Sequence, residues 1–203
     1  MKIYNHSLAP NPRRLRIFVA EKGLKIPYEE VDILAGKGRS PEFLKKNPAG
    51  GVPVLELDDG TCLAESVAIC RYLEGLHPEP NLMGKDAREQ AFIEQWNRRI
   101  ELLLFGTVGR AFQNTSPMLA QFGPQFKDYG AAQLTAGQAQ LEWLDKQLND
   151  REFIAGPRYT IADITAQVAV DFGTQMAGLR LDSSLANASR WHKSVSSRPS
   201  AKA

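Results

Sequence analysis

The stretch over residues 51–72 constrains the fold more than any other part of this 203-residue chain. Residues 52–57 read Val-Pro-Val-Leu-Glu-Leu and alternate as the side chains of a half-buried strand do. An Asp-Asp-Gly sequence at 58–60 is a strong signal for a tight turn, and a second short apolar run follows at 61–63. The pattern predicts two antiparallel strands joined by that turn.

The proline at the start of this stretch, Pro53, limits how the strand begins. Proline has no backbone N–H for a strand ladder, so Pro53 belongs at the first residue of a strand or on an edge. An X-Pro bond is also the one peptide bond for which the cis form is energetically accessible. If the Val52–Pro53 bond is cis, the amide and carbonyl of Val52 turn outward and can pair with an extended peptide. The alternative is a trans proline that starts an edge strand.

A Glu-Ser pair, Glu65 and Ser66, follows the second predicted strand and opens a helix. The unpaired amides of a first helical turn and the helix dipole attract an anion. Ser66 and Glu65 can therefore complete a pocket for a carboxylate beside an ammonium group, and the alternative is that both residues only cap the helix. The helix itself is predicted from apolar residues at helical spacing: Val67, Ile69, Cys70, Tyr72 and Leu73.

The residues before this stretch predict a strand-helix-strand unit. The strands are expected at Lys2–Asn5 and Tyr28–Ile33, and the helix at Asn11–Lys22, with Asn11 as its cap. A right-handed crossover makes these two strands parallel, so the hairpin completes a mixed four-stranded sheet. A short helix is expected from Ser40, where a serine cap precedes a proline.

A proline-rich step near residues 77–81 marks the domain boundary. We expect a thioredoxin-like α/β domain over 1–77, a linker over 78–86 and an all-helical domain over 87–203. Within the second domain, apolar spacing predicts helices over 86–109 and 131–148, with breaks between them at 114–124. Thr160 and Asp163 have the spacing of a reciprocal helix cap, with Asp in place of the usual Glu.

Composition favours a compact soluble protein, with 43% hydrophobic and 24% charged residues. No run of about 18 apolar residues occurs and no secretory leader is recognised, so a cytoplasmic location without membrane insertion is expected. The net charge of +2 gives no reason to expect nucleic acid as a partner. Arg13, Arg14 and Arg16 are interpreted as a solvated helix face.

Neither cysteines nor histidines form a recognisable metal site. Cys62 and Cys70 lie outside any Cys-X-X-Cys spacing, and they are interpreted as small buried apolar residues. The three histidines are scattered along the sequence. No metal and no resident cofactor are therefore expected.

Two segments together resemble the amino-terminal domain of the cytosolic glutathione S-transferases: Asn-Pro-Ala-Gly-Gly-Val-Pro-Val-Leu at 47–55 and Leu-Ala-Glu-Ser-Val-Ala-Ile-Cys-Arg-Tyr-Leu at 63–73. The resemblance implies a cis Pro53, with the backbone of Val52 pairing with the cysteine of glutathione. It further implies that Glu65 and Ser66 hold the γ-glutamyl end. Lys37, in the loop after the second strand, is placed to reach the glycyl carboxylate, and the alternative is a solvated lysine.

A glutathione transferase must lower the pKa of the glutathione thiol, because the thiolate is the nucleophile. At the position where serine and cysteine classes carry their donor, this chain has Ala9 and Pro10. Tyr4 is interpreted as a core residue. The remaining candidate catalytic donors are Asn11 and Ser7, together with the first amides of the helix.

The segment around Ala9–Arg14 resembles an atypical fungal and bacterial branch of the family, in which no Ser, Tyr or Cys activates the thiol. In that branch a helix terminus and a water held by second-domain side chains are given this role. The matching region here has Gln113 and Asn114 where a histidine is expected, which puts the water route in doubt. Ser116 and Asn114 are the candidates for holding that water.

The resemblance covers essentially the whole chain and implies conjugation of glutathione to small hydrophobic electrophiles, with organic peroxides as further substrates. A glutathione-dependent disulfide reductase and a non-catalytic binding module are the alternatives. The resemblance also implies a homodimer. The electrophile is expected to contact aromatic residues of the second domain, and the alternative is that these residues belong to its core. The residues are Phe105, Phe112, Phe122 and Phe126.

Overall fold

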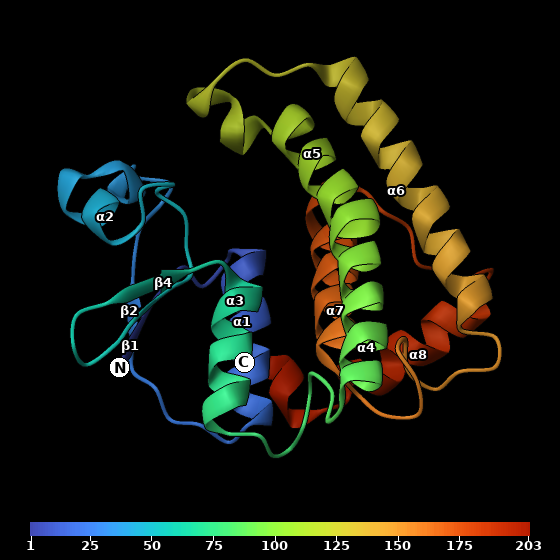
Figure 1. Cartoon of the computed structure of the whole chain (residues 1–203). Coiled ribbons are helices and arrows are strands. Elements are labelled where there is room, and N and C mark those ends of the chain that lie inside the picture. Colours follow the sequence, from blue (N-terminus) through green and yellow to red (C-terminus); the bar gives the residue numbers. More distant parts are fainter. The chain divides into compact units, whose positions relative to one another are not determined.

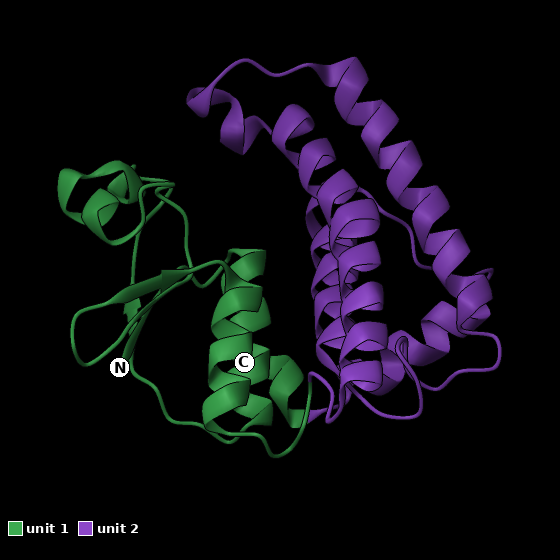
Figure 2. Cartoon of the chain, viewed as in Figure 1, with its two compact units in different colours: residues 1–82, 199–203 green, residues 83–198 purple.

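The chain folds into two units, which the computed structural model describes over residues 1–203. Unit 1 comprises Met1–Leu82 together with Pro199–Ala203, and unit 2 comprises Met83–Arg198 (Figure 2). Unit 1 contains all four strands of the named sheet, while unit 2 is built from helices (Figure 1). The predicted fold class, a thioredoxin-like α/β part followed by an all-helical part, is confirmed. None of the helices is long and apolar enough to cross a membrane.

The sheet of unit 1 has the strand order β2-β1-β3-β4. Strand β1 (Lys2–Asn5) pairs in parallel with β2 (Tyr28–Glu30) and antiparallel with β3 (Val54–Glu56). Strand β3 pairs antiparallel with β4 (Cys62–Ala64). The mixed sheet and the hairpin are therefore as predicted, although β2 ends at Glu30 and does not continue to Ile33.

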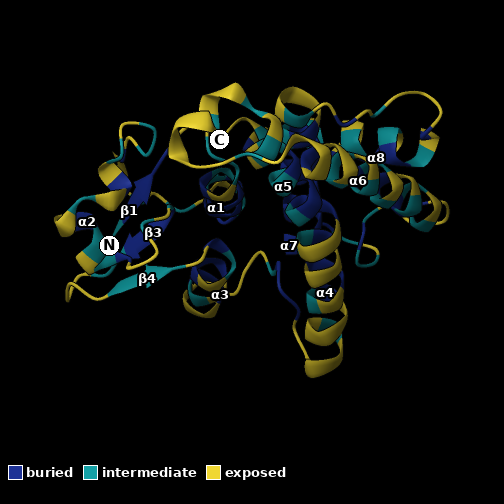
Figure 3. Cartoon of the chain, turned by 90° about the horizontal axis from the view of Figure 1, so that it is seen from above, coloured by how far each residue is buried: buried dark blue, intermediate teal, exposed yellow.

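The two faces of this sheet carry different helices. Helices α1 (Pro10–Glu21) and α3 (Ser66–Leu76) lie on one side, and the short helix α2 (Pro41–Lys46) lies on the other (Figures 1 and 3). Strands β1 and β3 are largely buried and appear dark blue in Figure 3, whereas β4 is half-buried. Both faces of the two central strands are thus covered.

Tyr4 belongs to the core on the α2 side of the sheet. It is 4% exposed and packs with Val31, Phe43 and Val54. Its hydroxyl donates to the Glu56 carboxylate at 2.6 Å. The interpretation of Tyr4 as a core residue is confirmed.

Helix α1 begins one residue before the predicted start. Its N-cap is Ala9, with extended backbone at φ −82° and ψ 138°, and Pro10 is the first helical residue. A proline disfavours the helical conformation for the residue before it and suits the first helical position itself. The prediction that Asn11 caps the helix is therefore wrong, because Asn11 is the second residue of α1.

Helix α2 begins as predicted, with Ser40 as its N-cap. The Ser40 hydroxyl accepts a hydrogen bond from the Phe43 N–H at 3.2 Å. Pro41 takes the first helical position, where no N–H is needed.

A buried ion pair fixes the carboxyl ends of α1 and α3. The Lys22 side chain is fully buried and its ammonium pairs with the Glu74 carboxylate. The same ammonium donates to the carbonyls of His77 and Pro80 at 2.8 and 2.7 Å. Glu74 in turn accepts from the Leu82 N–H at 2.9 Å, so this pair orders the segment that ends unit 1.

The last five residues of the chain return to unit 1. They form a short 3-10 turn, Pro199–Lys202, against α1. Arg13 donates to the carbonyl of Ala201 at 3.2 Å, and the Ser200 hydroxyl contacts the Glu21 carboxylate.

Unit 2 begins with a long helical segment that changes pitch in its middle. Helix α4 (Ala87–Arg99) passes through a π-helical stretch, Ile100–Phe105, into α5 (Gly106–Thr115). The structure thus extends the predicted helix by about a turn and a half beyond residue 109. A 3-10 stretch, Pro117–Phe122, occupies the predicted break, and α6 (Lys127–Gln147) follows.

Helix α7 (Ile161–Phe172) is the centre of unit 2, because every residue from Ile161 to Asp171 is buried. A second π-helical stretch, Gly173–Ala177, continues it, and α8 (Ala186–Ser196) completes the unit.

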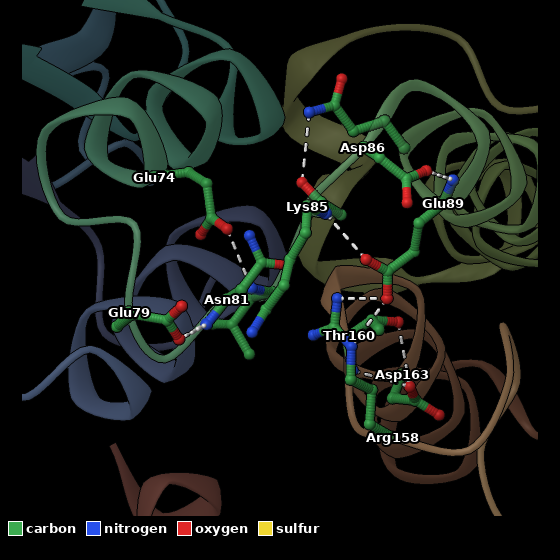
Figure 4. Close-up of polar contacts among 12 residues, drawn as sticks. Glu74, Glu79, Asn81, Lys85, Asp86, Glu89, Arg158, Thr160 and Asp163 are labelled. Carbon is green, nitrogen blue, oxygen red and sulfur yellow. Dashed lines mark hydrogen bonds and ion pairs between the residues drawn. The ribbon is translucent and has the colours of Figure 1, made fainter.

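Polar contacts of Glu89 hold the first turn of helix α4 in place. Glu89 donates its N–H to Asp86 and receives a two-pronged contact from Arg158 at 2.6 and 2.8 Å (Figure 4).

The start of α7 is held by the carboxylate of Asp163, which confirms the predicted capping box with Thr160. This carboxylate accepts from the Thr160 backbone N–H at 3.0 Å (Figure 4). It also accepts from the Ile154 backbone N–H at 2.9 Å and from the Trp191 indole at 3.0 Å. Burial raises the pKa of Asp163 to about 6, and these hydrogen bonds oppose that rise. One side chain therefore joins the α7 start, the preceding loop and α8.

We expect the Asp163→Ala variant to lose about 3 kcal/mol or more of unfolding free energy, because it leaves several buried donors without an acceptor. Asp145→Ala is a matched control, since Asp145 accepts a single bond, from the Ala188 N–H at 2.8 Å. That control is expected to cost about 1 kcal/mol. Urea denaturation measures both, and equal losses in the two variants would contradict the central role of Asp163.

Candidate functional site

The strand register brings the predicted site residues to one end of the sheet. Tyr4 is paired with Val54, and Val54 with Ala64. Because both pairings are antiparallel, the chain leaving β1, the chain entering β3 and the chain leaving β4 emerge at the same end. The parallel partner β2 ends there too, since Asn5 is paired with Glu30. The segments that carry Ser7, Val52, Ser66 and Lys37 therefore all start from this end.

The edge of this site is formed by the residues that enter β3. The Val52–Pro53 peptide bond is cis, as the family resemblance implies. Pro53 is buried and Val52 is half-buried. Neither the N–H nor the C=O of Val52 has a hydrogen-bond partner within the chain. These two backbone groups are free to pair with an extended peptide, which is how an added strand binds.

The amino terminus of α3 supplies the polar part of the site. Glu65, its N-cap, is exposed and has φ 68° and ψ 110°, the only positive φ of a non-glycine residue in the chain. Ser66 follows as the first helical residue and is 4% exposed. The first intrahelical bond is donated by Ile69 to Glu65, so the N–H groups of Ser66, Val67 and Ala68 have no helical acceptor.

The hydroxyl of Ser66 has a buried cationic neighbour. Arg14, from α1, donates through Nη1 to the Ser66 Oγ at 3.0 Å. Arg14 is 1% exposed, so its interpretation as part of a solvated face is wrong. Arg13 and Arg16 on the same helix are half-buried, and Arg16 donates to Asn5 and to the Ser7 carbonyl.

The loop that carries Lys37 packs directly on the loop that leads to Val52. Lys37 opens a 3-10 turn, Lys37–Arg39, and is exposed. A Cβ atom on Gly38 would lie 2.4 Å from the Gly50 carbonyl oxygen, and one on Gly50 would lie 2.7 Å from the Gly38 oxygen. Only glycines permit this backbone contact, which places the Lys37 turn beside the loop that leads to the unpaired backbone of Val52.

Asn47 stabilises the loop that leads to Val52 through hydrogen bonds to its backbone. It is 7% exposed, and its side-chain amide donates to the Gly51 carbonyl at 2.8 Å while its oxygen accepts from the Ala49 N–H at 3.1 Å. The Gly50 N–H also donates to the Asn47 carbonyl. Asn47 therefore fixes the backbone immediately before Val52.

The start of α1 offers few donors for a thiolate. Pro10 and Pro12 have no N–H, so among the first three residues of this helix only Asn11 has one. Asn11 is exposed, and its side-chain amide can also donate. The cap residue of this helix is Ala9, whose side chain has neither a hydroxyl nor a thiol.

Ser7 lies in a loop that is tied to the end of β2. Its N–H donates to the Glu30 carboxylate at 2.6 Å, and Asn5 donates to the same carboxylate at 2.8 Å. Partial burial opposes ionisation of Glu30, but these hydrogen bonds lower its pKa on balance. The backbone of Ser7 is therefore fixed, and its exposed side chain remains a candidate donor.

The candidates in unit 2 differ in what their side chains do. The Asn114 amide donates to the Arg110 carbonyl and its oxygen accepts from the Phe126 N–H, so both ends are used within the unit. Phe105 is 8% exposed, and Phe112 packs edge-on against Phe172. Phe122 and Phe126 are 53% and 64% exposed, so they are the exposed members of the four predicted aromatic contacts.

Two contributors to the site, Arg14 and Asn47, were not recognised from the sequence as site residues. Arg14 has a usable signal: it stands three and four residues before the buried Ile17 and Phe18, on the same helix face. Asn47 is preceded by a short helix and followed by Pro-Ala-Gly-Gly, which is typical of a side chain that braces its own loop. No group of three or more His, Cys, Asp or Glu residues is arranged to hold a metal ion.

Family comparisons agree with this architecture along the chain. Residues 1–75 match the model described as glutathione S-transferase, N-terminal domain, and residues 107–199 match glutathione S-transferase, C-terminal domain. The chain is 35% identical over 209 aligned positions to glutathione S-transferase 2 of Saccharomyces cerevisiae, covering 100% of this chain and 88% of that protein.

Solved structures give the same result. A glutathione S-transferase domain-containing protein from Marinobacter aquaeolei superposes with a TM-score of 0.92 at 38% identity, covering 98% of this chain and 99% of the other. Gtt2 from Saccharomyces cerevisiae superposes with a TM-score of 0.93 at 34% identity, covering 100% and 99%.

The backbone of Glu65 generates a stability prediction. Glycine adopts a positive φ without steric cost, whereas alanine keeps the strain, which is about 1–3 kcal/mol for such a conformation. We expect Glu65→Gly to be more stable than Glu65→Ala by about 1 kcal/mol in urea denaturation. Ala68, exposed inside α3, is the matched control, where Ala68→Gly should destabilise by about 1 kcal/mol. A Glu65→Gly variant that is less stable than Glu65→Ala would contradict the strain.

Proposed function

The chain belongs to the glutathione S-transferase family and is an enzyme of that family, and we propose that it binds glutathione at the strand ends of unit 1 and transfers the glutathione sulfur to small electrophiles. The observation that carries this proposal is the unpaired Val52 backbone beside the cis Pro53, at the same end of the sheet as the open amino terminus of α3. A tripeptide needs both a backbone partner and partners for its charged ends.

The γ-glutamyl end of glutathione carries an α-carboxylate and an α-ammonium group. We assign the carboxylate to the Ser66 hydroxyl and the free N–H groups of the α3 amino terminus, where no acidic residue occurs in the first turn. The exposed Glu65 carboxylate takes the ammonium. The strained φ of Glu65 supports this assignment, since strain of this kind gathers at ligand-binding positions.

The other two residues of the tripeptide are assigned from the neighbouring loops. The cysteinyl residue pairs through its backbone with the N–H and C=O of Val52. The glycyl carboxylate is assigned to the exposed ammonium of Lys37, whose turn packs on the Gly50 loop. This assignment gives a side chain of opposite charge to the ammonium and to the glycyl carboxylate, and the amino terminus of a helix to the α-carboxylate.

The chemical step needs a thiolate, because a free thiol with a pKa of about 8.5 is mostly protonated at neutral pH. We assign its stabilisation to Asn11, through the backbone N–H and the side-chain amide, with Ser7 as the second donor. The thiolate then attacks the electrophilic carbon, a new S–C bond forms, and the leaving group departs with the bonding electron pair. With an organic peroxide the thiolate attacks one peroxide oxygen instead, the O–O bond breaks and the alcohol leaves. A second glutathione thiol then attacks the resulting sulfenic sulfur, which forms glutathione disulfide and releases water.

Several further properties follow from family membership as proposals. The lack of a Ser, Tyr or Cys donor at the α1 cap supports placement in the atypical branch of the family. We propose a cytoplasmic homodimer that acts in detoxification, with the accessible Phe122 and Phe126 as contacts for a hydrophobic electrophile. Sedimentation at micromolar concentration tests the dimer. Parallel assays with an aryl halide and a glutathione-containing disulfide separate a transferase from a disulfide reductase.

Glutathione is expected to stabilise the protein against heat, by about 2.7 kcal/mol at roughly 100 times its dissociation constant. Ser66→Ala should weaken binding about tenfold in calorimetry, since it removes a donor to a charged group. Ser200→Ala is the control, because the Ser200 hydroxyl contacts Glu21 at the other end of α1. The proposal fails if millimolar glutathione causes no thermal shift.

Asn11→Ala is expected to raise the pKa of the bound glutathione thiol by about one unit, because a hydrogen bond to the thiolate is lost. The ultraviolet absorbance of the thiolate, followed against pH, measures this pKa directly. The kcat/KM profile should move to higher pH by the same amount. Ser7→Ala is the comparison: a shift only in that variant would transfer the role to Ser7, and no shift in either would remove both.

A further inference from the structure

The buried guanidinium of Arg14 is in direct contact with Ser66, a proposed glutathione-binding side chain. It lies on the α1 face that carries Ile17 and Phe18, and its Nη1 is 3.0 Å from the Ser66 Oγ. Burying a guanidinium is costly unless its donors have partners, and the Ser66 hydroxyl is one of those partners. The contact joins the only two helices on this face of the sheet, α1 and α3.

The chemistry of the contact fixes the direction of the Ser66 hydroxyl. A guanidinium has five N–H donors and no acceptor, and it stays charged at every physiological pH. Ser66 Oγ must therefore accept from Arg14, so its own proton is left to donate elsewhere. A hydroxyl that accepts from a cation is also a stronger donor, because the two hydrogen bonds polarise each other.

The first turn of α3 has no competing negative group. The Cys70 thiol one turn further along α3 stays neutral, because burial raises its pKa to about 12 even with Arg14 nearby. No acidic residue is present in the first turn of α3. A Ser66 hydroxyl that is oriented as a donor therefore adds to the free N–H groups and the helix dipole in favouring a carboxylate.

We propose that Arg14 is a positioning residue for glutathione, which orients the Ser66 hydroxyl as a donor and selects ligands whose γ-linked residue carries an α-carboxylate. This inference rests on the proposed function of the Ser66 site and goes beyond it. It assigns ligand selectivity to a side chain that does not itself touch the ligand.

The test compares two ligands that differ only at that carboxylate: glutathione and 4-aminobutyryl-cysteinylglycine, which lacks it. Calorimetry on the full chain is expected to show that Arg14→Met weakens glutathione binding about tenfold, the loss of one charge-assisted hydrogen bond, and leaves the analogue within about twofold. Arg14→Lys, which keeps the charge, should lie between wild type and Arg14→Met. A merely structural role of Arg14 would weaken both ligands equally and would overturn the proposal.

Two further variants keep the outcome decisive. Arg13→Lys makes the same chemical change one residue away, where the side chain contacts the Ala201 carbonyl, and should bind both ligands as the wild type does. In a Ser66→Ala background, Arg14→Lys should no longer alter glutathione affinity, because the shared hydrogen bond is already absent. If Arg14→Met does not fold, the comparison of Arg14→Lys in the wild-type chain with Arg14→Lys in the Ser66→Ala chain gives the answer. Wild-type protein that binds no glutathione refutes the proposed function, whereas normal binding with unchanged selectivity in the Arg14 variants refutes only this inference.

Discussion

The structure depends on one register: β3 pairs with β1 through Tyr4 and Val54, and with β4 through Val54 and Ala64. Side chains alternate along a strand, so a slip by one residue would move Tyr4 and Val54 out of the core beneath α2. The same slip would separate the backbone of Val52 from the start of α3. The hydrophobic pattern that stabilises the sheet therefore also sets the geometry of the ligand site, and neither can change alone.

The proposed glutathione site of unit 1 uses backbone groups more than reactive side chains. The Val52 amide and carbonyl and the first N–H groups of α3 are all left unpaired by the fold. Such groups bind without side-chain entropy to lose, but they need rigid support. That support comes from neighbouring side chains that are buried, Asn47 under the entering loop and Arg14 behind Ser66. In the proposed site, the binding groups are thus held in place by residues that are not themselves assigned to glutathione.

The sequence predicts the elements well where a local pattern decides them. The hairpin at 58–60, the cap at Ser40 and the Thr160–Asp163 pair each depend on a few adjacent residues, and all three are present. Prediction from the sequence fails where the environment of a residue is set by a partner far away in the chain. Three arginines on one helix look like a solvated surface until α3 is placed, because the Ser66 hydroxyl lies 52 positions away from Arg14 in the chain. The assignment of glutathione to this site depended on a family resemblance, since no local pattern specifies a tripeptide.

At the start of α1, the proline at position 10 limits which groups can stabilise a thiolate. Asn11 looks like a helix cap because Pro12 follows it, but the preceding Pro10 already fixes Ala9 in the extended conformation and begins the helix. Two prolines in the first turn then leave a single backbone donor where most helices have several. A thiolate at this point cannot depend on the helix dipole alone, because few oriented N–H groups can reach it. In the proposed mechanism, side-chain amides and hydroxyls supply the remaining stabilisation, and Asn11 and Ser7 are the candidates for it.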